Sequence, residues 1–411
     1  MAEVTAALRP FQSQRVALVA GVAAAAGWGT LALGFGSHRR AIAYAYLTAF
    51  AAVASLALGA LFFLMIHYAA GARWHTVVRR LNEGVVGSLP LLGLLFVPVL
   101  LSLRELYAWT NLAAFHEQAH AIIAHKRAYL NGPAFAWRSL GYFVIWLVAA
   151  ELLCRWSFAR DPGSKRAPTA PRVPAADPDV ELHPRERVFA SALLPLVSLA
   201  LTFAAFDWVM SLEPLWYSTL FGVYVFAGAM SGAVALLTLL AFLTARSDYA
   251  PGAIRPPHFH ALGRLMLTFA IFWAYCAFFQ ALLIQIADKP VEVAYYLRRL
   301  HGGWAPVTLL LVLVRFALPF AVLLPRRPKF DGRLMAVVGG LGLFAHYVDA
   351  YWLIAPVDRS HLPLPGLFDL AALLAVAGTA VAGAALRLRG RLLVPLGDPA
   401  LAHSLEYRSP L

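Results

Sequence analysis

The chain has 411 residues, of which 61% are hydrophobic and only 13% are charged, whereas an ordinary soluble chain is nearer a quarter charged. This composition excludes a soluble globular protein and indicates a membrane protein. The formal net charge of +13 would suit a nucleic-acid-binding protein, but the sequence has no basic patch interleaved with aromatic residues. We therefore expect no nucleic-acid partner.

Apolar runs long enough to cross a hydrocarbon layer, which needs about 20 helical residues, recur along the chain. The ten runs are 16 to 36, 41 to 69, 84 to 103, 135 to 157, 188 to 210, 217 to 244, 262 to 287, 302 to 324, 333 to 355 and 366 to 387. None alternates as the strands of a membrane β-barrel do, so backbone groups must be satisfied within helices. The predicted fold class is an all-α integral membrane protein with about ten transmembrane helices. We expect two tandem four-helix bundles, spans 2 to 5 and 6 to 9, plus two flanking helices.

Lys and Arg are unevenly distributed between the two sides of these spans. With the N-terminus inside, about 23 of them lie on the inner side and about 10 on the outer side, and Arg315 lies within a span. Loops on the cytoplasmic side of membrane proteins carry the excess of positive charge. The bias predicts that both termini are cytoplasmic.

An H-E-x-x-H sequence, His116-Glu117-Gln118-Ala119-His120, lies in the long outer connection from Arg104 to Ala134. On a helix, two histidines at this spacing can bind zinc, with the glutamate activating water. A zinc protease also needs a third protein ligand and a substrate cleft, and no second cluster follows at a recognisable spacing. We therefore interpret this stretch as a solvated or partner-facing amphipathic helix, and the protein as not a zinc protease.

The longest interruption between spans is rich in Pro and charge and runs from 158 to 187. We expect it to be a cytoplasmic linker that contacts a neighbouring protein or anionic lipid. The predicted division is therefore an N-terminal transmembrane half at 1–157, the linker at 158–187, a C-terminal transmembrane half at 188–387 and a cytoplasmic tail at 388–411.

Two spans close with similar sequences. Asp207 precedes Pro214 by seven residues at the end of span 5, and Asp349 precedes Pro356 by seven at the end of span 9. Each stretch also carries a tryptophan, and the two spans run in the same direction. This echo is what a tandem repeat of two four-helix units would produce.

Ionisable residues inside the membrane cost at least about 2.5 to 3.5 kcal/mol each at the bilayer centre, so each one calls for an explanation. From the inner side to the outer rim, the residues are His67, Glu151, Arg315, Asp207, His346, Asp349, Glu105, Glu213, Asp288 and Asp369. Read as functional, they form a proton path or a polar pocket for a quinol headgroup. Read as structural, they are buried polar contacts that lock helices together. His346 and Asp349 share a helix face and could exchange protons near neutral pH.

Redox metals have no evident ligands in the sequence. His67 and His346 should differ in depth by about 15 Å at 1.5 Å per helical residue, so they cannot be the two axial ligands of one haem. Cys154 and Cys276 each lie alone in a span and are interpreted as small packed hydrophobes. We expect no metal or redox cofactor in this chain.

Four stretches carry a resemblance to a known family. They are KRAYLNGPAFAWRSLGYFVIW (126 to 146), LPLVSLALTFAAFDWVMSLEPLWYSTLFGVYVFAGAMSG (194 to 232), FWAYCAFFQALLI (272 to 284) and VDAYWLIAPV (348 to 357). In this order, across spans 4 to 9, the chain resembles the F subunit of bacterial alternative complex III, which is related to the polysulfide-reductase-type (NrfD-like) membrane anchors. The chain departs from the family after span 7, where it has IADKPVEV (286 to 293), so a role for acids there depends on Asp288 and Glu292.

The resemblance implies a bacterial inner-membrane subunit of a quinol:cytochrome c oxidoreductase, or of one with another periplasmic acceptor. It implies haem c and iron-sulfur clusters in partner subunits, a homologous membrane anchor subunit that holds the better-supported quinol site, and association with a terminal oxidase as a further option. Bound quinol or lipid is the only cofactor expected for this chain itself. In this reading Asp207, Arg315, His346 and Asp349 form the centre of a proton-conducting or coupling path. The alternatives are a secondary transporter with a tandem-repeat helical fold and a purely structural anchor.

Overall fold

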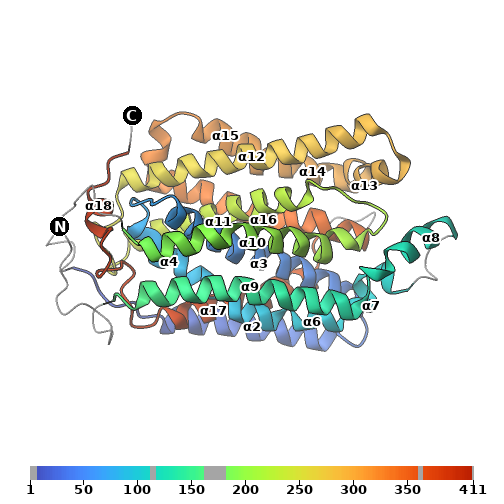
Figure 1. The fold of residues 1–411 in the computed structure, drawn as a ribbon, viewed down its shortest axis with the longest axis horizontal. Coiled ribbons are helices and arrows are strands. Elements are labelled where there is room, and N and C mark those ends of the chain that lie inside the picture. Colours follow the sequence, from blue (N-terminus) through green and yellow to red (C-terminus); the bar gives the residue numbers. More distant parts are fainter. Residues whose placement is uncertain (1–6, 112–116, 162–181, 360–363, 410–411) are drawn as a thin grey trace.

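A computed structural model describes residues 7–111, 117–161, 182–359 and 364–409 of the chain. In these ranges the protein is helical, and the only β-type contact is one isolated bridge between Pro10 and Leu392. Ten helical segments are long and apolar enough to cross a membrane, and they lie side by side along one axis (Figure 1). The prediction of an all-α membrane protein with ten spans is therefore confirmed.

The ten spans are formed by single helices or by short consecutive ones. They are α2 (Gln14–Gly34), α3 (Arg39–Ala69), α4 (Thr76–Val86) with α5 (Leu89–Leu95) and α6 (Val97–Leu101), α9 (Gly132–Phe158), α10 (Pro184–Trp208) with η4 (Met210–Leu212), α11 (Phe221–Ala245), α12 (Pro256–Ala287), η5 (Gly302–Trp304) with α14 (Ala305–Val312), η6 (Leu313–Ala317) and α15 (Leu318–Leu323), α16 (Gly332–Ile354) with η8 (Ala355–Val357), and α17 (Leu367–Arg387).

Shorter helices lie in the connections. They are α7 (Leu103–Leu106), η1 (Ala108–Thr110), α8 (Glu117–His125), η3 (Lys126–Ala128), α13 (Pro290–Leu300), η7 (Arg327–Phe330) and α18 (Leu401–Leu405).

The third span begins earlier than its hydropathy predicts. The apolar run starts at 84, but the helix starts at Thr76. Arg79, Arg80 and Glu83 lie in this additional part of α4, where all three are fully buried and Glu83 pairs with both arginines. A hydropathy profile assigns such charges to a loop, since it counts their transfer cost without the partner that offsets it.

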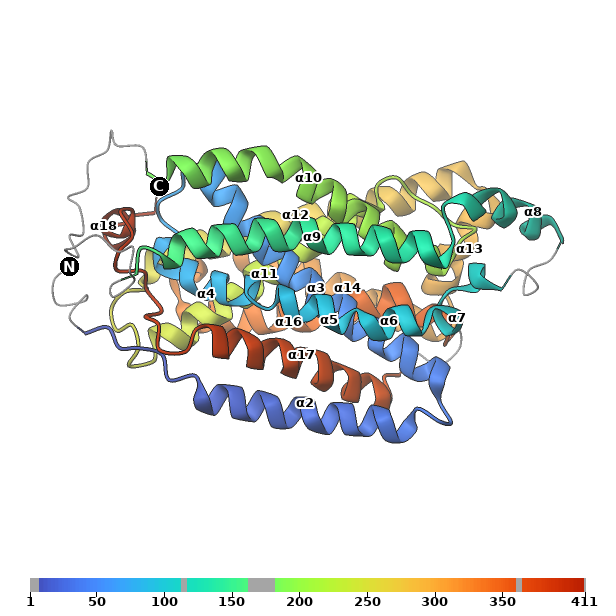
Figure 2. The same ribbon diagram turned by 60° about the horizontal axis from the view of Figure 1, so that its bottom comes forward.

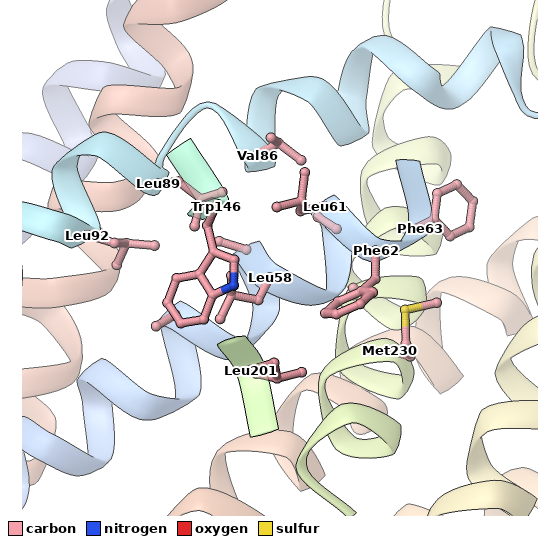
Figure 3. Packing of buried hydrophobic residues seen from close by; sticks show 14 of the residues in the cluster. Leu58, Leu61, Phe62, Phe63, Val86, Leu89, Leu92, Trp146, Leu201 and Met230 are labelled. Carbon is pink, nitrogen blue, oxygen red and sulfur yellow. The ribbon is translucent and has the colours of Figure 1, made fainter. Parts of the chain in front are cut away.

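The helices form two groups that meet at α3 and α11. In the first group α3 packs against α4 and α10, and α10 packs against α9; in the second, α11 packs against α12 and α16. Figure 3 shows this core from close by. Leu58 of α3 lies near the fully buried Trp146 of α9, and Phe62 of α3 lies near Met230 of α11. The buried α3 contacts both groups and therefore forms the centre of the molecule.

The first and last spans form a pair at the edge of the first group (Figure 2). A Cβ on Gly27 of α2 would lie 2.4 Å from the carbonyl oxygen of Ala371, and one on Gly378 of α17 would lie 2.7 Å from that of Ala20. Helices associate closely in lipid where small residues let their backbones approach. Two glycines on facing helices thus explain how α2, which is otherwise mostly exposed, is held.

The molecule has two distinct ends. The terminal end, at the left in Figure 1, contains the start of α2, the end of α17 and α18. Phe11 N donates to the Arg391 carbonyl over 2.8 Å and Gly390 N donates to that of Phe11 over 3.1 Å, so the segments that flank the first and last spans are joined there. The loop end, opposite, contains α7, α8 and α13. The positive-inside rule predicts that the terminal end faces the cytoplasm.

Candidate functional site

The central feature of the second group is a buried ion pair between Arg315 and Asp349. Arg315 Nη1 lies 3.4 Å from Asp349 Oδ2, and the two side chains are 2% and 6% exposed. The guanidinium also donates to the carbonyls of Ala345 (3.2 Å) and Gly228 (3.0 Å). Tyr224 of α11 donates its hydroxyl to the other carboxylate oxygen of Asp349. The positive charge of Arg315 thus balances the negative charge of Asp349, and Tyr224 adds a hydrogen bond to the carboxylate.

Arg315 lies on η6, a π-helical turn between α14 and α15. Pro319 follows four residues later and has no backbone N–H, so it cannot donate to the Arg315 carbonyl as an α-helix requires. The backbone hydrogen-bond pattern changes there from bonds between residues four apart to bonds between residues five apart, and Leu318 N donates to the Leu313 carbonyl. Such turns recur at functional sites because they re-aim a side chain within a helix.

His346 lies one turn before Asp349 on α16 and is also buried. Its Nε2 lies 3.0 Å from the Ser55 hydroxyl oxygen and 3.0 Å from the Ala52 carbonyl, both on α3. Its Nδ1 has no hydrogen-bond partner among the described residues. A histidine with one ring nitrogen anchored and the other unpaired can accept a proton without losing its orientation.

Two glycines of α11 leave the space that these side chains occupy. A Cβ on Gly228 would lie 3.0 Å from Arg315 Nη2, and a Cβ on Gly232 would lie 2.7 Å from His346 Nδ1. The two glycines are four residues apart and share a helix face. Arg315, Asp349 and His346 therefore form one group, the central cluster, which contacts the glycine face of α11.

Asp207 lies apart from the central cluster, in an ion pair of the first group. Arg138 of α9 donates from Nε and Nη2 to both oxygens of Asp207 over 2.9 Å, and Tyr142 donates over 2.8 Å. No hydrogen bond or ion pair between described residues joins this group to Arg315. Of the four residues expected at the centre of a path, three are adjacent and the fourth belongs to a separate pair.

The two pairs are related in the way that a tandem repeat predicts. Asp207 of span 5 pairs with an arginine of span 4, and Asp349 of span 9 pairs with an arginine of span 8. The tryptophans repeat the relation: Trp208 Nε1 donates to Ser139 of span 4 over 3.0 Å, and Trp352 Nε1 donates to Thr308 of span 8 over 2.8 Å. The sequence echo thus extends to the partners of these residues.

Carboxylates at the loop end are also paired with arginines. Glu213 pairs with Arg298 (3.0 Å) and with the buried Arg299 (2.7 Å), both on α13. Asp369 pairs with Arg359 over 2.6 Å and accepts a bond from Gly366 N at the start of α17.

The other acids at the loop end have little burial or only a local partner. Asp288 is exposed after α12, Glu105 is half-buried in α7, and Glu292 of α13 lies 3.6 Å from Lys289, the residue just before that helix. Asp288 is the C-cap residue at the end of α12, and Glu105 and Glu292 lie in the first turns of their helices.

His67 and Glu151 lie toward the terminal end, away from the central cluster. His67 Nδ1 lies 2.7 Å from the Phe63 carbonyl, and its ring stacks on that of Phe63. Because His346 contacts α3 at Ser55, it lies about 18 Å along that helix from His67. Glu151 is half-exposed and pairs with Arg155 (2.8 Å) and Arg387 (2.6 Å).

A buried charge network at the terminal end was missed by the sequence interpretation. Asp398, beyond the last span, pairs with Arg79 of α4 and lies 3.1 Å from His183 Nε2. Burial raises the pKa of Asp398, but the nearby Arg79, His183 and Arg160 outweigh it and hold the pKa well below its usual value. The available signal was the spacing of three charged residues, since Glu83 follows Arg79 by four residues and Arg80 by three.

The H-E-x-x-H sequence gains no further ligand from the part of the chain that the structure describes. His116 and the side chain of Glu117 lie outside the described residues, and His120 is exposed on α8, which projects from the bundle (Figure 2). No three His, Cys, Asp or Glu side chains in the described ranges come together as a metal site. Cys154 and Cys276 are buried and free.

An apolar pocket of about 220 Å³ lies between α2, α3 and α6. Two of its polar groups are already engaged: Tyr46 donates its hydroxyl to the Leu95 carbonyl, and Trp28 Nε1 donates to Thr379. The pocket therefore suits a hydrocarbon chain better than a polar headgroup.

No family model matches the chain, and no curated protein matches it.

Proposed function

We propose that this chain is a bacterial inner-membrane subunit of a quinol-oxidising complex with a periplasmic electron acceptor, related to the F subunit of alternative complex III. In this role the chain carries no electrons. Its part is to move protons or to transmit a conformational change through the central cluster of Arg315, Asp349 and His346.

The observation that carries the proposal is the central cluster itself. A buried arginine and carboxylate could be purely structural, but here the carboxylate also accepts from Tyr224 and the nearby His346 keeps Nδ1 unpaired. Intramembrane ionisable residues of this kind mark proton relays and ion pathways. The π-helical turn that aims Arg315 into the bundle supports the same interpretation.

The resemblance supports the choice of complex. The similar stretches, 126 to 146, 194 to 232, 272 to 284 and 348 to 357, include Arg138, Asp207, Tyr224 and Asp349. These are members of the two repeated ion pairs or direct partners of them. The family likeness and the buried charges therefore coincide.

The decisive experiment is purification of the tagged chain from its own membranes in mild detergent, with identification of the partners. We expect haem c absorbance, iron-sulfur proteins and a homologous membrane anchor in the same particle. A chain that purifies alone, without redox proteins, would exclude the proposal.

A secondary transporter is the second candidate, and the repeated Asp–Arg pairs favour it specifically because transporters are commonly built from internal repeats. A transporter would move substrate when the chain alone is reconstituted in liposomes. A purely structural anchor would tolerate neutral replacement of Asp207, Arg315, His346 and Asp349 without loss of turnover in the complex.

A further inference from the structure

A pocket of about 400 Å³ at the terminal end lies between the last turn of α9 and the end of α17. Glu151, Arg155 and Phe158 contribute from α9, and Arg387 and Arg391 contribute from the end of α17 and the turn after it. Three arginines thus face one glutamate across this space. From this geometry we propose that the pocket binds the headgroup of an anionic phospholipid.

The arginines are held in place by the acids beside them. Glu151 accepts from Arg155 on one oxygen (2.8 Å) and from Arg387 on the other (2.6 Å), so both guanidinium groups lie at the pocket wall, and Arg387, at 24% exposed, is held more firmly than Arg155, at 70%. Arg391 donates to Asp161 over 3.1 Å, and its guanidinium lies 4.1 Å from the centre of the Phe158 ring. A guanidinium fixed in this way binds phosphate with little further loss of side-chain entropy.

Positive charge remains after these pairs are counted. Glu151 is shared by two arginines, and Asp161 is shared by Arg391 and the buried Arg80. Each guanidinium has five N–H donors, and the glutamate uses one from each of its two partners. The remaining donors of Arg155 and Arg387 suit an anion with several oxygens, as a phosphodiester has.

The pocket continues into a surface suited to acyl chains. Val148, Val144 and Leu140 precede Glu151 by 3, 7 and 11 residues, so they extend its face along α9. They are 47%, 50% and 52% exposed. Both α9 and α17 end here, where membrane-spanning segments reach the headgroup layer, and basic pockets between transmembrane helices bind anionic headgroups.

The test compares lipid binding by the delipidated protein, in whatever complex it purifies with, using native mass spectrometry. Phosphatidylglycerol is titrated against the parent protein and the variant Arg155→Gln/Arg391→Gln, and phosphatidylcholine serves as the zwitterionic lipid. We expect the double variant to bind phosphatidylglycerol roughly tenfold more weakly or worse, because charge-assisted hydrogen bonds are lost. Phosphatidylcholine has the same phosphodiester but offsets its charge with a quaternary ammonium, so it should bind the parent more weakly than phosphatidylglycerol and lose less affinity in the double variant; equal affinity of the parent for the two lipids would overturn the preference for an anionic headgroup.

The matched control is Arg389→Gln, which removes an exposed arginine of the same end that does not line the pocket. It should bind phosphatidylglycerol within about twofold of the parent. Equal weakening by Arg389→Gln would show diffuse charge attraction and overturn the site. Unchanged binding in the double variant would overturn it as well.

A competition experiment and a single variant complete the test. Inorganic phosphate should not displace the lipid, because it has no acyl chains to lie along α9; displacement at equal concentration would reassign the pocket to free phosphate. Should the double variant not fold, Arg155→Gln alone serves instead, since that side chain is 70% exposed and its loss leaves Glu151 paired with Arg387.

Discussion

Asp349 is the residue on which the proposed function depends most directly. It is the only carboxylate of the central cluster, and Arg315 and Tyr224 both bond to it. Arg315 has two backbone carbonyls as further acceptors, so loss of the carboxylate charge would leave the guanidinium hydrogen-bonded.

The variant Asp349→Asn is expected to assemble but to lose roughly 100-fold in proton-coupled turnover, because the amide cannot take up a proton as a carboxylate does. Quinol-dependent acceptor reduction and proton release by the purified complex measure the effect. Asp288→Asn, at an exposed acid of the loop end, is the control and should have full activity. Full activity in Asp349→Asn would remove the residue from the path.

Gly232 is expected to be intolerant of a larger side chain. In Gly232→Ala the new methyl group would lie 2.7 Å from His346 Nδ1 and 2.7 Å from Leu56, so both must move. We expect a loss of about 1 to 3 kcal/mol of stability, seen as a lower thermal midpoint in detergent. Gly340→Ala on α16 has nothing within 4 Å of the new atom and should be neutral or slightly stabilising; equal losses in the two variants would contradict this packing.

At the scale of the element, α13 holds together the segments at the loop end of the second group. Its buried Arg299 bonds to Glu213, before α11, and to the carbonyls of Trp352 (3.2 Å) and Leu353 (3.0 Å) on α16. One side chain thereby joins three elements. This amphipathic helix is too short to span a membrane, and its arginine gives it a fixed position.

Replacement of Arg299 by Gln should cost about 3 kcal/mol, since it removes one partner of a buried charge pair. The neighbouring Arg298 binds the same glutamate but is 38% exposed, so Arg298→Gln should cost less than about 1 kcal/mol. Thermal unfolding in detergent compares the two, and hydrogen exchange of α13 should increase only in Arg299→Gln. Equal costs would mean that burial does not distinguish the two arginines.

At the scale of the whole molecule, the tail after α17 is tied into the terminal end. Asp398 reaches back to Arg79 at the start of the third span and to His183 at the start of the fifth. Three segments distant in sequence are therefore held by one carboxylate. The tail belongs to the folded body.

This arrangement predicts how stability depends on pH. The pKa of Asp398 is well below its ordinary value of 3.8 in the folded protein, so its contribution is complete above that value and is lost as the pH falls below it. Removing the charge should have the same cost at every pH above that value: Asp398→Asn should lose about 3 kcal/mol at pH 7 by leaving Arg79 buried without its main partner. Thermal unfolding of the parent and of Asp398→Asn at pH 7 and pH 5 measures this. The difference in stability between the two proteins should be equal at the two pH values, and a smaller difference at pH 5 would contradict the lowered pKa of Asp398.

The sequence was sufficient for the number of spans, because transfer of apolar helices into lipid depends on local composition. It was also sufficient to single out Asp207 and Asp349, since an acid in an apolar run is conspicuous. It could not identify Arg138 as the partner of Asp207, Tyr224 as a partner of Asp349, or Ser55 and Gly232 as neighbours of His346, because these contacts join different helices. The start of the third span was misplaced for the same reason: the charges of α4 are offset by residues such as Asp398 that lie far along the chain.

The glycine-mediated pairing of α2 with α17 has a consequence for biosynthesis. Among the ten described spans, α2 is translated before the other nine and its partner α17 after them, so at typical rates of roughly 5 to 20 residues per second the two are separated by tens of seconds. During that interval the nascent first helix stays in the bilayer with its small-residue face open to lipid or to an insertase. The packing of α2 against α17 is therefore a late step of folding. A chain whose translation stops before Leu367 would lack α17, and its α2 would have no helix to pack against.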